Sequence, residues 1–164
     1  MTEQELISIA EKAVLNLIKE NKTLSVAESC TGGWLSKILT DIGGVSAIYK
    51  GGVCSYANET KTNILGVKEE TLEAFGAVSE QVAYQMANGV RKVLNTDIGI
   101  GITGIAGPAS DNTSKPVGLI YVAISSKEKT IVKELRNNFS DDIRTNNRLS
   151  AIETALNLLG DINE

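Results

Sequence analysis

A short run of small and polar residues is the segment of this sequence best suited to chemistry. Ser29, Cys30 and Thr31 supply two hydroxyls and a thiol, and Gly32 and Gly33 follow them directly, before an apolar pattern typical of a helix. A helix start presents unpaired N–H groups and a positive dipole end, so it could hold a phosphate or an oxyanion. The two glycines would let a ligand approach the backbone closely. The alternative is an ordinary helix cap made by Ser29 or Thr31.

The absence of histidine limits how a serine in this chain could be activated. Ser-His-Asp triads, Cys-His pairs and His-ligated metals are excluded, so acid–base work falls to carboxylates, lysine, tyrosine or a thiol. Tyr56 and Lys61 follow a predicted strand that, if parallel to the strand before Ser29, would bring them close to it. A lysine acts as a base only when neutral, which requires its pKa to fall from about 10.4 to roughly 7–8. From spacing alone, Lys61 also fits a solvated helix position and Tyr56 a half-buried strand end.

Residues later in the chain could complete a ligand site. Thr103 offers a hydroxyl at the end of a predicted strand, and the segment 104–108 adds backbone N–H groups. Arg144 and Arg148 lie four residues apart at the start of a predicted helix, where cations oppose the helix dipole. An anionic ligand would explain this placement, and so would pairing with the preceding aspartates or plain exposure.

Two other patterns suggest different chemistry. Cys30 is a rival nucleophile, although a low thiol pKa there would depend on the helix dipole and a lysine. The segment 99–104 reads G-x-G-x-x-G, the string found in dinucleotide-binding oxidoreductases. Its glycines alternate within an Ile-rich run instead of opening a helix. We therefore expect a buried strand in which Gly99 and Gly101 make room for a neighbouring element, and no bound NAD.

The hydrophobic pattern predicts strands separated by helices. Thr2 and Glu5 form a capping box for the first helix. The predicted helices cover 3–20, 35–42, 58–65, 68–75, 80–94 and a segment from about Ser140 to 159, and the strands cover 23–28, 47–56, 97–103, 117–125 and 130–137. The last two strands form a hairpin, so we expect a three-layer α/β/α sandwich around a mixed sheet of about five strands. Ligands gather at the carboxyl ends of such strands, here the turns after Glu28, Tyr56 and Thr103.

Composition narrows the class of protein. A length of 164 residues suits one domain, predicted over 1–164, and the net charge of −4 argues against a nucleic-acid partner. No apolar run approaches the roughly eighteen residues that a membrane span needs. Cys30 and Cys54 show no CxxC pairing, which argues against a disulfide framework or a structural metal. We therefore expect a cytoplasmic protein with no membrane partner.

Several linked motifs follow one another along nearly the whole chain. They are Ala27-Glu28-Ser29-Cys30-Thr31-Gly32-Gly33, Tyr56 with Asn58 and Lys61, Leu65-Gly66-Val67, Gly76-Ala77-Val78-Ser79, Thr103-Gly104-Ile105-Ala106-Gly107-Pro108 and Lys115-Pro116-Val117-Gly118. Each motif alone is weak, and their combination is far more specific. Together they resemble the C-terminal domain of CinA, a family of nicotinamide-nucleotide amidases.

The resemblance implies an enzyme of pyridine-nucleotide salvage that hydrolyses the carboxamide of nicotinamide mononucleotide (NMN) to nicotinic acid mononucleotide and ammonia, without a metal or cofactor. It implies that Ser29 is the nucleophile, Lys61 its general base, and Tyr56 a partner that positions or relays the proton. The expected substrate-binding residues are Cys30, Thr31, Gly32, Gly33, Thr103, Gly104, Ala106, Gly107 and Arg144. The alternative is a non-catalytic nucleotide-binding module, which the loop 109–114 favours because it departs from the family pattern. An enzyme of this size is often a small homo-oligomer.

Overall fold

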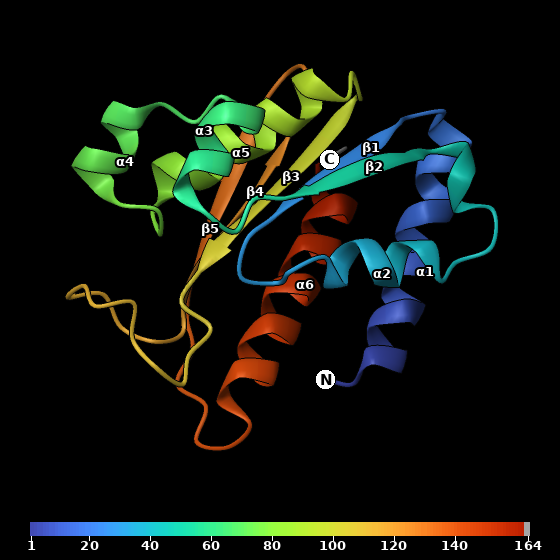
Figure 1. Ribbon diagram of the computed structural model, residues 1–164. Coiled ribbons are helices and arrows are strands. Elements are labelled where there is room, and N and C mark those ends of the chain that lie inside the picture. The colour runs from blue at the N-terminus through green and yellow to red at the C-terminus, as the bar shows by residue number, and fades with distance from the viewer. Residues whose placement is uncertain (163–164) are drawn as a thin grey trace.

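In the computed structural model, which describes residues 1–162, a five-stranded sheet lies between two layers of helices (Figure 1). This is the predicted three-layer α/β/α arrangement, and the element types follow the predicted order. The elements are α1 (Glu3–Glu20), β1 (Leu24–Glu28), α2 (Trp34–Thr40), a 3₁₀ turn (Val45–Ala47), β2 (Tyr49–Cys54), α3 (Asn58–Leu65), α4 (Glu69–Phe75), α5 (Glu80–Val93), β3 (Ile98–Gly104), β4 (Leu119–Ser125), β5 (Thr130–Arg136) and α6 (Ile143–Asp161).

The sheet is mixed and has the strand order β2-β1-β3-β4-β5. β1 is parallel to both β2 and β3, whereas β3, β4 and β5 are joined by antiparallel pairing. Glu28 at the end of β1 pairs with Cys54 of β2 and Ile102 of β3. The carboxyl ends of the three parallel strands therefore meet at one edge, where the loops after them come together.

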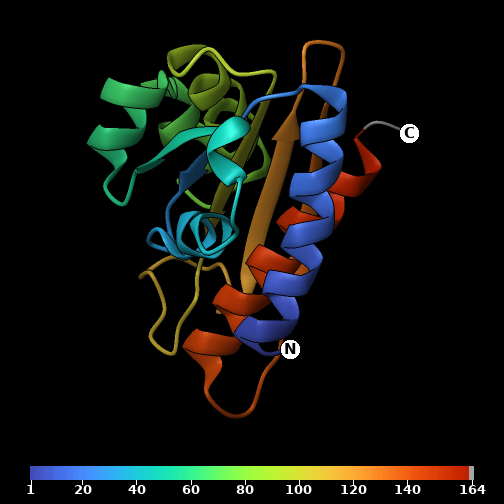
Figure 2. The same ribbon diagram turned by 90° about the vertical axis from the view of Figure 1, so that its right-hand side faces the viewer.

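The two helical layers cover opposite faces of the sheet, as the two perpendicular views show (Figures 1 and 2). α1, α2 and α6 pack with the sheet around the larger apolar core, and α5 with the end of α3 forms a second core on the other face. β1 is buried along its whole length because helices cover it on both sides. Within residues 1–162, none of the helices combines the length and apolar composition needed to cross a membrane.

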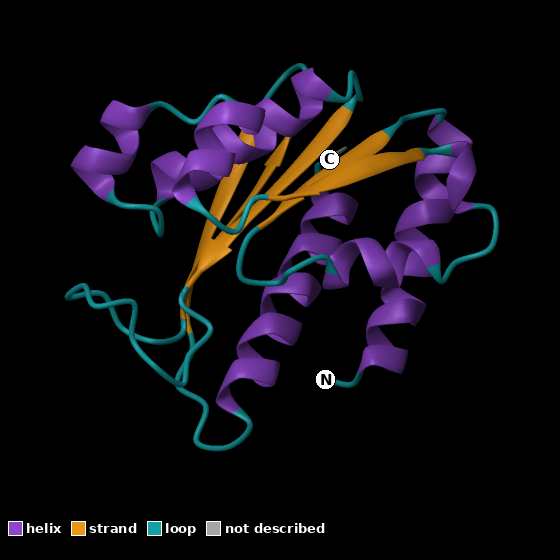
Figure 3. Ribbon diagram, in the orientation of Figure 1, coloured by secondary structure: helices purple, strands orange, loops and turns teal. Residues whose placement is uncertain are grey.

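Several element boundaries differ from the predicted ones, most clearly those of β2 and α6. β2 covers only Tyr49–Cys54, because the residues before it form a 3₁₀ turn. α6 begins at Ile143 instead of near Ser140. Asp142 is its N-cap residue, with a φ of 41°, and it makes no side-chain cap bond. The long loop between β3 and β4 and the start of α6 both extend past the edge of the sheet where the parallel strands have their carboxyl ends (Figure 3).

Glycines in β3 make room for α5, as predicted. A Cβ added to Gly99 would lie 2.3 Å from the Ala87 carbonyl oxygen, and one added to Gly101 would lie 2.7 Å from the Ala83 carbonyl oxygen. Both contacts are with the α5 backbone, which cannot yield without moving the helix. The G-x-G-x-x-G string is therefore a packing device in a buried strand, and it opens no helix.

Gly101→Ala is expected to lower the free energy of unfolding by about 1–3 kcal/mol, because the added methyl overpacks the contact between β3 and α5. Gly43→Ala is the matched control, since its added Cβ meets nothing within 4 Å. Urea unfolding followed by circular dichroism gives the free energy of unfolding of wild type and both variants. Equal midpoints for Gly101→Ala and wild type would contradict the packing explanation.

Candidate active site

The carboxyl edge of the sheet brings Lys61 into contact with Ser29. Ser29 directly follows β1, and its N–H donates to the Ile102 carbonyl of β3 at 3.0 Å, which fixes the start of the loop. Lys61 lies on α3, which follows β2 closely in the chain. Its Nζ lies 3.0 Å from the Ser29 Oγ, and the two residues are 1% and 8% exposed. A hydroxyl and an amine thus share a site from which bulk water is largely excluded.

The surroundings of the Lys61 amine shift its protonation equilibrium toward the neutral form. Its Nζ donates to the carbonyl oxygens of Ser55 at 2.7 Å and Tyr56 at 3.4 Å. No carboxylate within residues 1–162 forms an ion pair with it. Burial therefore lowers the pKa of Lys61 from 10.5 to about 8. A neutral amine has two N–H groups for the two carbonyls and one lone pair, which is left for the hydroxyl hydrogen of Ser29.

Cys30 does not suit the role of rival nucleophile. Its side chain is 6% exposed, and burial raises the pKa of its thiol to about 12. The thiol is therefore protonated at neutral pH, whereas the thiolate is the reactive form.

The start of α2 is already occupied by a carboxylate, so the expectation that it holds an oxyanion or phosphate is wrong. The Trp34 N–H donates to the Thr31 carbonyl at 3.0 Å. The N–H groups of Leu35 and Ser36 donate to the two Glu28 carboxylate oxygens at 2.9 and 3.1 Å. These first N–H groups of the helix are satisfied within the protein, and neither Ser29 nor Thr31 caps it.

Gly32 and Gly33 serve the conformation of the loop. Their φ angles are +59° and +96°, in the left-handed region of the backbone, which residues other than glycine adopt only at an energetic cost. Gly33 is the N-cap residue of α2. Neither glycine lines the pocket beside Ser29, and Thr31 is fully buried away from it. Three of the expected substrate-binding residues, Thr31, Gly32 and Gly33, therefore lie outside the pocket.

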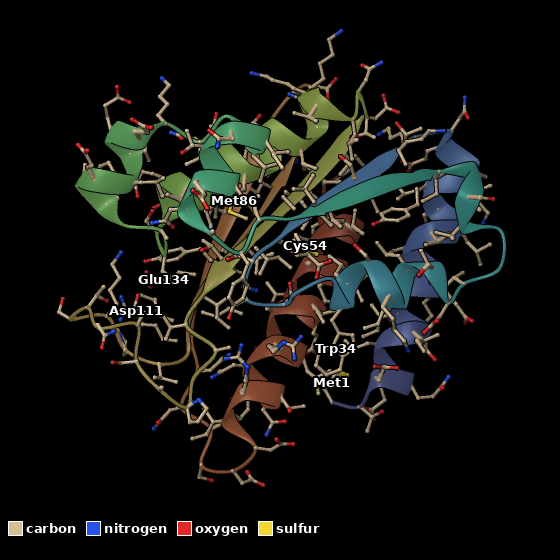
Figure 4. All side chains as sticks on the ribbon, in the orientation of Figure 1. Met1, Trp34, Cys54, Met86, Asp111 and Glu134 are labelled. Atoms are coloured by element: carbon tan, nitrogen blue, oxygen red, sulfur yellow. The ribbon has the colours of Figure 1, made fainter. Side chains whose placement is uncertain are left out.

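The remaining predicted residues line one pocket of about 240 Å³ at the carboxyl edge of the sheet. They are Ser29, Cys30, Tyr56, Lys61, Thr103, Gly104, Ala106, Gly107 and Arg144. The pocket is also lined by Asn58, Ala77 and Val78, which the sequence reasoning did not assign to the site, and by Ile105, Ala109, Ser110 and Asp111 of the loop after β3. Asp111 lies on the extended loop after β3 (Figure 4).

Tyr56 and Arg144 meet at the mouth of this pocket. Tyr56 is 68% exposed, and its hydroxyl accepts a long hydrogen bond of 3.4 Å from the Arg144 guanidinium. The hydrogen bond from Lys61 to Tyr56 is made to the backbone carbonyl of the tyrosine. The structure therefore brings the Tyr56 ring into the site but gives its hydroxyl no hydrogen bond to Ser29 or Lys61 among the described residues.

The first turns of α6 hold the loops that surround the pocket. Arg144 donates to the Gly107 carbonyl and Asn147 to the Ala106 carbonyl, each at 2.9 Å. Arg148 donates to the Thr31 carbonyl at 2.9 Å and lies 4.9 Å above the Trp34 ring. Figure 4 shows Trp34 between α1 and α6. Both arginines bind backbone carbonyls, so their pairing with the preceding aspartates, one of the alternatives, does not occur.

A second set of bonds holds the segment 75–79, of which Ala77 and Val78 line the pocket. Thr103 donates its hydroxyl hydrogen to the Ala77 carbonyl at 2.8 Å. The Lys115 ammonium donates to the carbonyls of Phe75 and Val78. With its hydrogen committed, the Thr103 hydroxyl can still accept a hydrogen bond from a ligand in the pocket.

The pocket suits an organic ligand. Within residues 1–162, no group of three or more cysteine, aspartate or glutamate side chains is arranged to hold a metal ion. The pocket instead offers a hydroxyl, an amine of lowered pKa, an arginine and backbone groups. Such a set can bind an anionic group and attack an electrophilic carbon beside it.

Several solved structures are similar to this chain over nearly its whole length. The competence/damage inducible protein CihA from Agrobacterium tumefaciens has a TM-score of 0.92 and 36% identity, covering 100% of this chain and 98% of that one. A CinA superfamily protein from Escherichia coli has a TM-score of 0.89 and 30% identity, covering 96% of this chain and 90% of that one.

Sequence comparison points to the same group. The chain is 46% identical over 147 residues to a CinA-like protein of Thermotoga neapolitana, covering 87% of this chain and 35% of that protein. It spans about a third of the length of the curated relatives it matches. The family model of the CinA C-terminal domain matches residues 6–162. The chain therefore belongs to the CinA C-terminal domain family.

Proposed function

We propose that this chain is a serine amidohydrolase that converts NMN to nicotinic acid mononucleotide and ammonia. The observation that carries the proposal is the contact of 3.0 Å between the Ser29 hydroxyl and the buried Lys61 amine. Two carbonyls accept the N–H groups of that amine, which leaves its lone pair for the serine proton. This is the activation that a serine needs in a chain without histidine.

The reaction proceeds in two halves. Neutral Lys61 takes the hydroxyl proton as the Ser29 oxygen bonds to the carboxamide carbon, and it then gives the proton to the departing nitrogen, which leaves as ammonia. Lys61 next takes a proton from water as that water attacks the acyl carbon. The bond to Ser29 breaks, and the proton returns from Lys61 to the serine oxygen. The product forms as the acid, and it gives the second water proton to solvent to become the carboxylate. The lysine begins and ends each cycle neutral.

Other pocket groups suit the same substrate. The N–H of Cys30, the residue after the nucleophile, is our candidate for the oxyanion donor, in place of the occupied start of α2. The Thr103 hydroxyl, whose hydrogen is committed to Ala77, can accept a hydrogen bond from the carboxamide N–H. Arg144 at the pocket mouth suits the phosphate, and the exposed Tyr56 ring offers a surface for the pyridinium ring.

Arg144→Ala is expected to raise KM for NMN about 10- to 100-fold, because it removes a charge-assisted contact to the phosphate. Nicotinamide riboside, which has the same carboxamide and no phosphate, is the matched control substrate. Its kcat/KM is expected to change little in the variant. An equal loss with both substrates would contradict a phosphate role for Arg144.

Ammonia release from NMN, with chromatography of the nicotinic acid mononucleotide formed, tests the proposal. The second candidate is a nucleotide-binding module without catalysis, favoured by the departure of the loop 109–114 from the family pattern, since Ala109, Ser110 and Asp111 line the pocket. Calorimetry with NMN separates the two. Binding without turnover over hours supports the module, and turnover supports the amidohydrolase.

A further inference from the structure

The residue immediately before the nucleophile carries a buried carboxylate that the proposed reaction does not use. Glu28 ends β1 and is 1% exposed. Its two oxygens accept hydrogen bonds from the Leu35 N–H at 2.9 Å, the Ser36 N–H at 3.1 Å and the Ser36 hydroxyl at 2.9 Å. The Tyr49 hydroxyl donates in turn to the Ser36 hydroxyl at 2.8 Å. No ion pair within residues 1–162 involves Glu28.

A buried carboxylate without a cation is costly unless hydrogen bonds replace its hydration. Here the replacement donors come from one place, the first turn of α2 and its Ser36 hydroxyl. The arrangement is more than a helix cap, because a cap normally comes from the residue at the helix start. Glu28 lies seven residues before Leu35, on the far side of the loop 29–33.

Glu28 therefore holds both ends of the loop that carries Ser29. Its main chain forms the entrance, where its carbonyl accepts the Ser55 N–H at 2.8 Å. Its side chain holds the exit at Leu35 and Ser36. Between these ends, the loop contains the left-handed Gly32 and Gly33, and such residues give a backbone many alternative conformations.

We propose that Glu28 is a positioning residue that fixes the Ser29 hydroxyl against the Lys61 amine by closing the loop 29–33 onto the start of α2. Glu28 does not line the pocket, so it acts through the loop and not on the substrate. The inference rests on the proposed function of Ser29. A reacting atom displaced by about 1 Å can lose about 10²-fold in rate, so the closure matters for catalysis.

The test compares Glu28→Gln with Glu3→Gln. Glutamine has nearly the shape of glutamate, but it has only one side-chain oxygen, and its NH₂ group would face one of the α2 donors. Glu3 is the matched control, because its carboxylate also binds α2, through the Trp34 indole and the Lys37 ammonium, and accepts no backbone N–H of that helix among the described residues. Hydrogen exchange of the peptide 29–36 is measured without substrate, together with kcat and KM for NMN. Calorimetry with nicotinic acid mononucleotide counts the intact sites per chain.

For Glu28→Gln we expect exchange in 29–36 at least about tenfold faster, kcat lower by about 10- to 100-fold, KM within about twofold of wild type, and one product site per chain. Glu3→Gln should match wild type. Unchanged exchange, an unchanged kcat, or a loss of kcat equal to the loss of product sites would overturn the inference. An inactive wild type would mean that the proposed function has failed, whereas a fully active Glu28→Gln variant would refute this inference alone.

Discussion

Ser29→Ala is expected to lower kcat for NMN hydrolysis by at least about 10³-fold and to change KM by only a few-fold. The variant loses the oxygen that bonds to the carboxamide carbon, so no acyl-enzyme forms. The pocket around it keeps its other lining groups, so binding of the nucleotide should persist. A lost kcat with retained binding distinguishes a nucleophile from a residue that only contacts substrate.

Ser25→Ala is the matched control for this variant. Ser25 lies on β1, the strand that Ser29 directly follows, and its buried hydroxyl shares a hydrogen bond of 2.6 Å with Thr96 at the far end of that strand. Its removal should leave kcat near the wild-type value, although it affects the free energy of unfolding. Ammonia release from NMN gives kcat for wild type, Ser29→Ala and Ser25→Ala. Substantial NMN hydrolysis by Ser29→Ala would exclude Ser29 as the nucleophile.

Lys61→Met is expected to lower kcat by about 10²- to 10⁴-fold, because no other basic side chain contacts the Ser29 hydroxyl in the part of the chain that the structure describes. Methionine has a similar volume and suits the buried position, so the loss should come from the missing base. Lys12→Met, on the exposed face of α1, is the control and should keep full activity. Near wild-type kcat in Lys61→Met would contradict the assignment of the base.

The same variant tests the lowered pKa through the stability of the fold. The pKa of Lys61 is about 8 in the folded protein and near 10.5 in the unfolded chain, so between these pH values the unfolded state binds more protons. The free energy of unfolding of wild type should therefore rise, relative to Lys61→Met, by up to about 3 kcal/mol as pH goes from 8 to 10.5. Urea unfolding at pH 7 and pH 10 measures the difference. A constant difference would mean that the Lys61 pKa is not lowered.

The sequence predicted the parts of the site that depend on strand order. A parallel pairing of the strands before Ser29 and Tyr56 follows from the alternation of strands and helices, and this pairing places Lys61 against Ser29. The packing of Gly99 and Gly101 against a helix was predictable because only glycine permits so close an approach. These features follow from local patterns and from topology.

The errors share a physical cause, since long side chains reach partners that spacing does not reveal. Glu28 was visible as a motif residue, but nothing local shows that its carboxylate reaches across the loop to α2. The role expected for Gly32 and Gly33 was wrong for the same reason, because it assumed an open helix start. Arg148 suggested an anion site, and instead it binds a carbonyl on a loop far away in the chain.

The pH dependence of kcat/KM for NMN tests most directly whether neutral Lys61 activates Ser29. Since the pKa of Lys61 is about 8 and the neutral form is reactive, kcat/KM should rise about tenfold per pH unit below pH 8 and level off above it. The chain has no histidine, so no inflection is expected near pH 6.5 from an imidazole. A profile that stays flat from pH 8 down to pH 5 would contradict the mechanism.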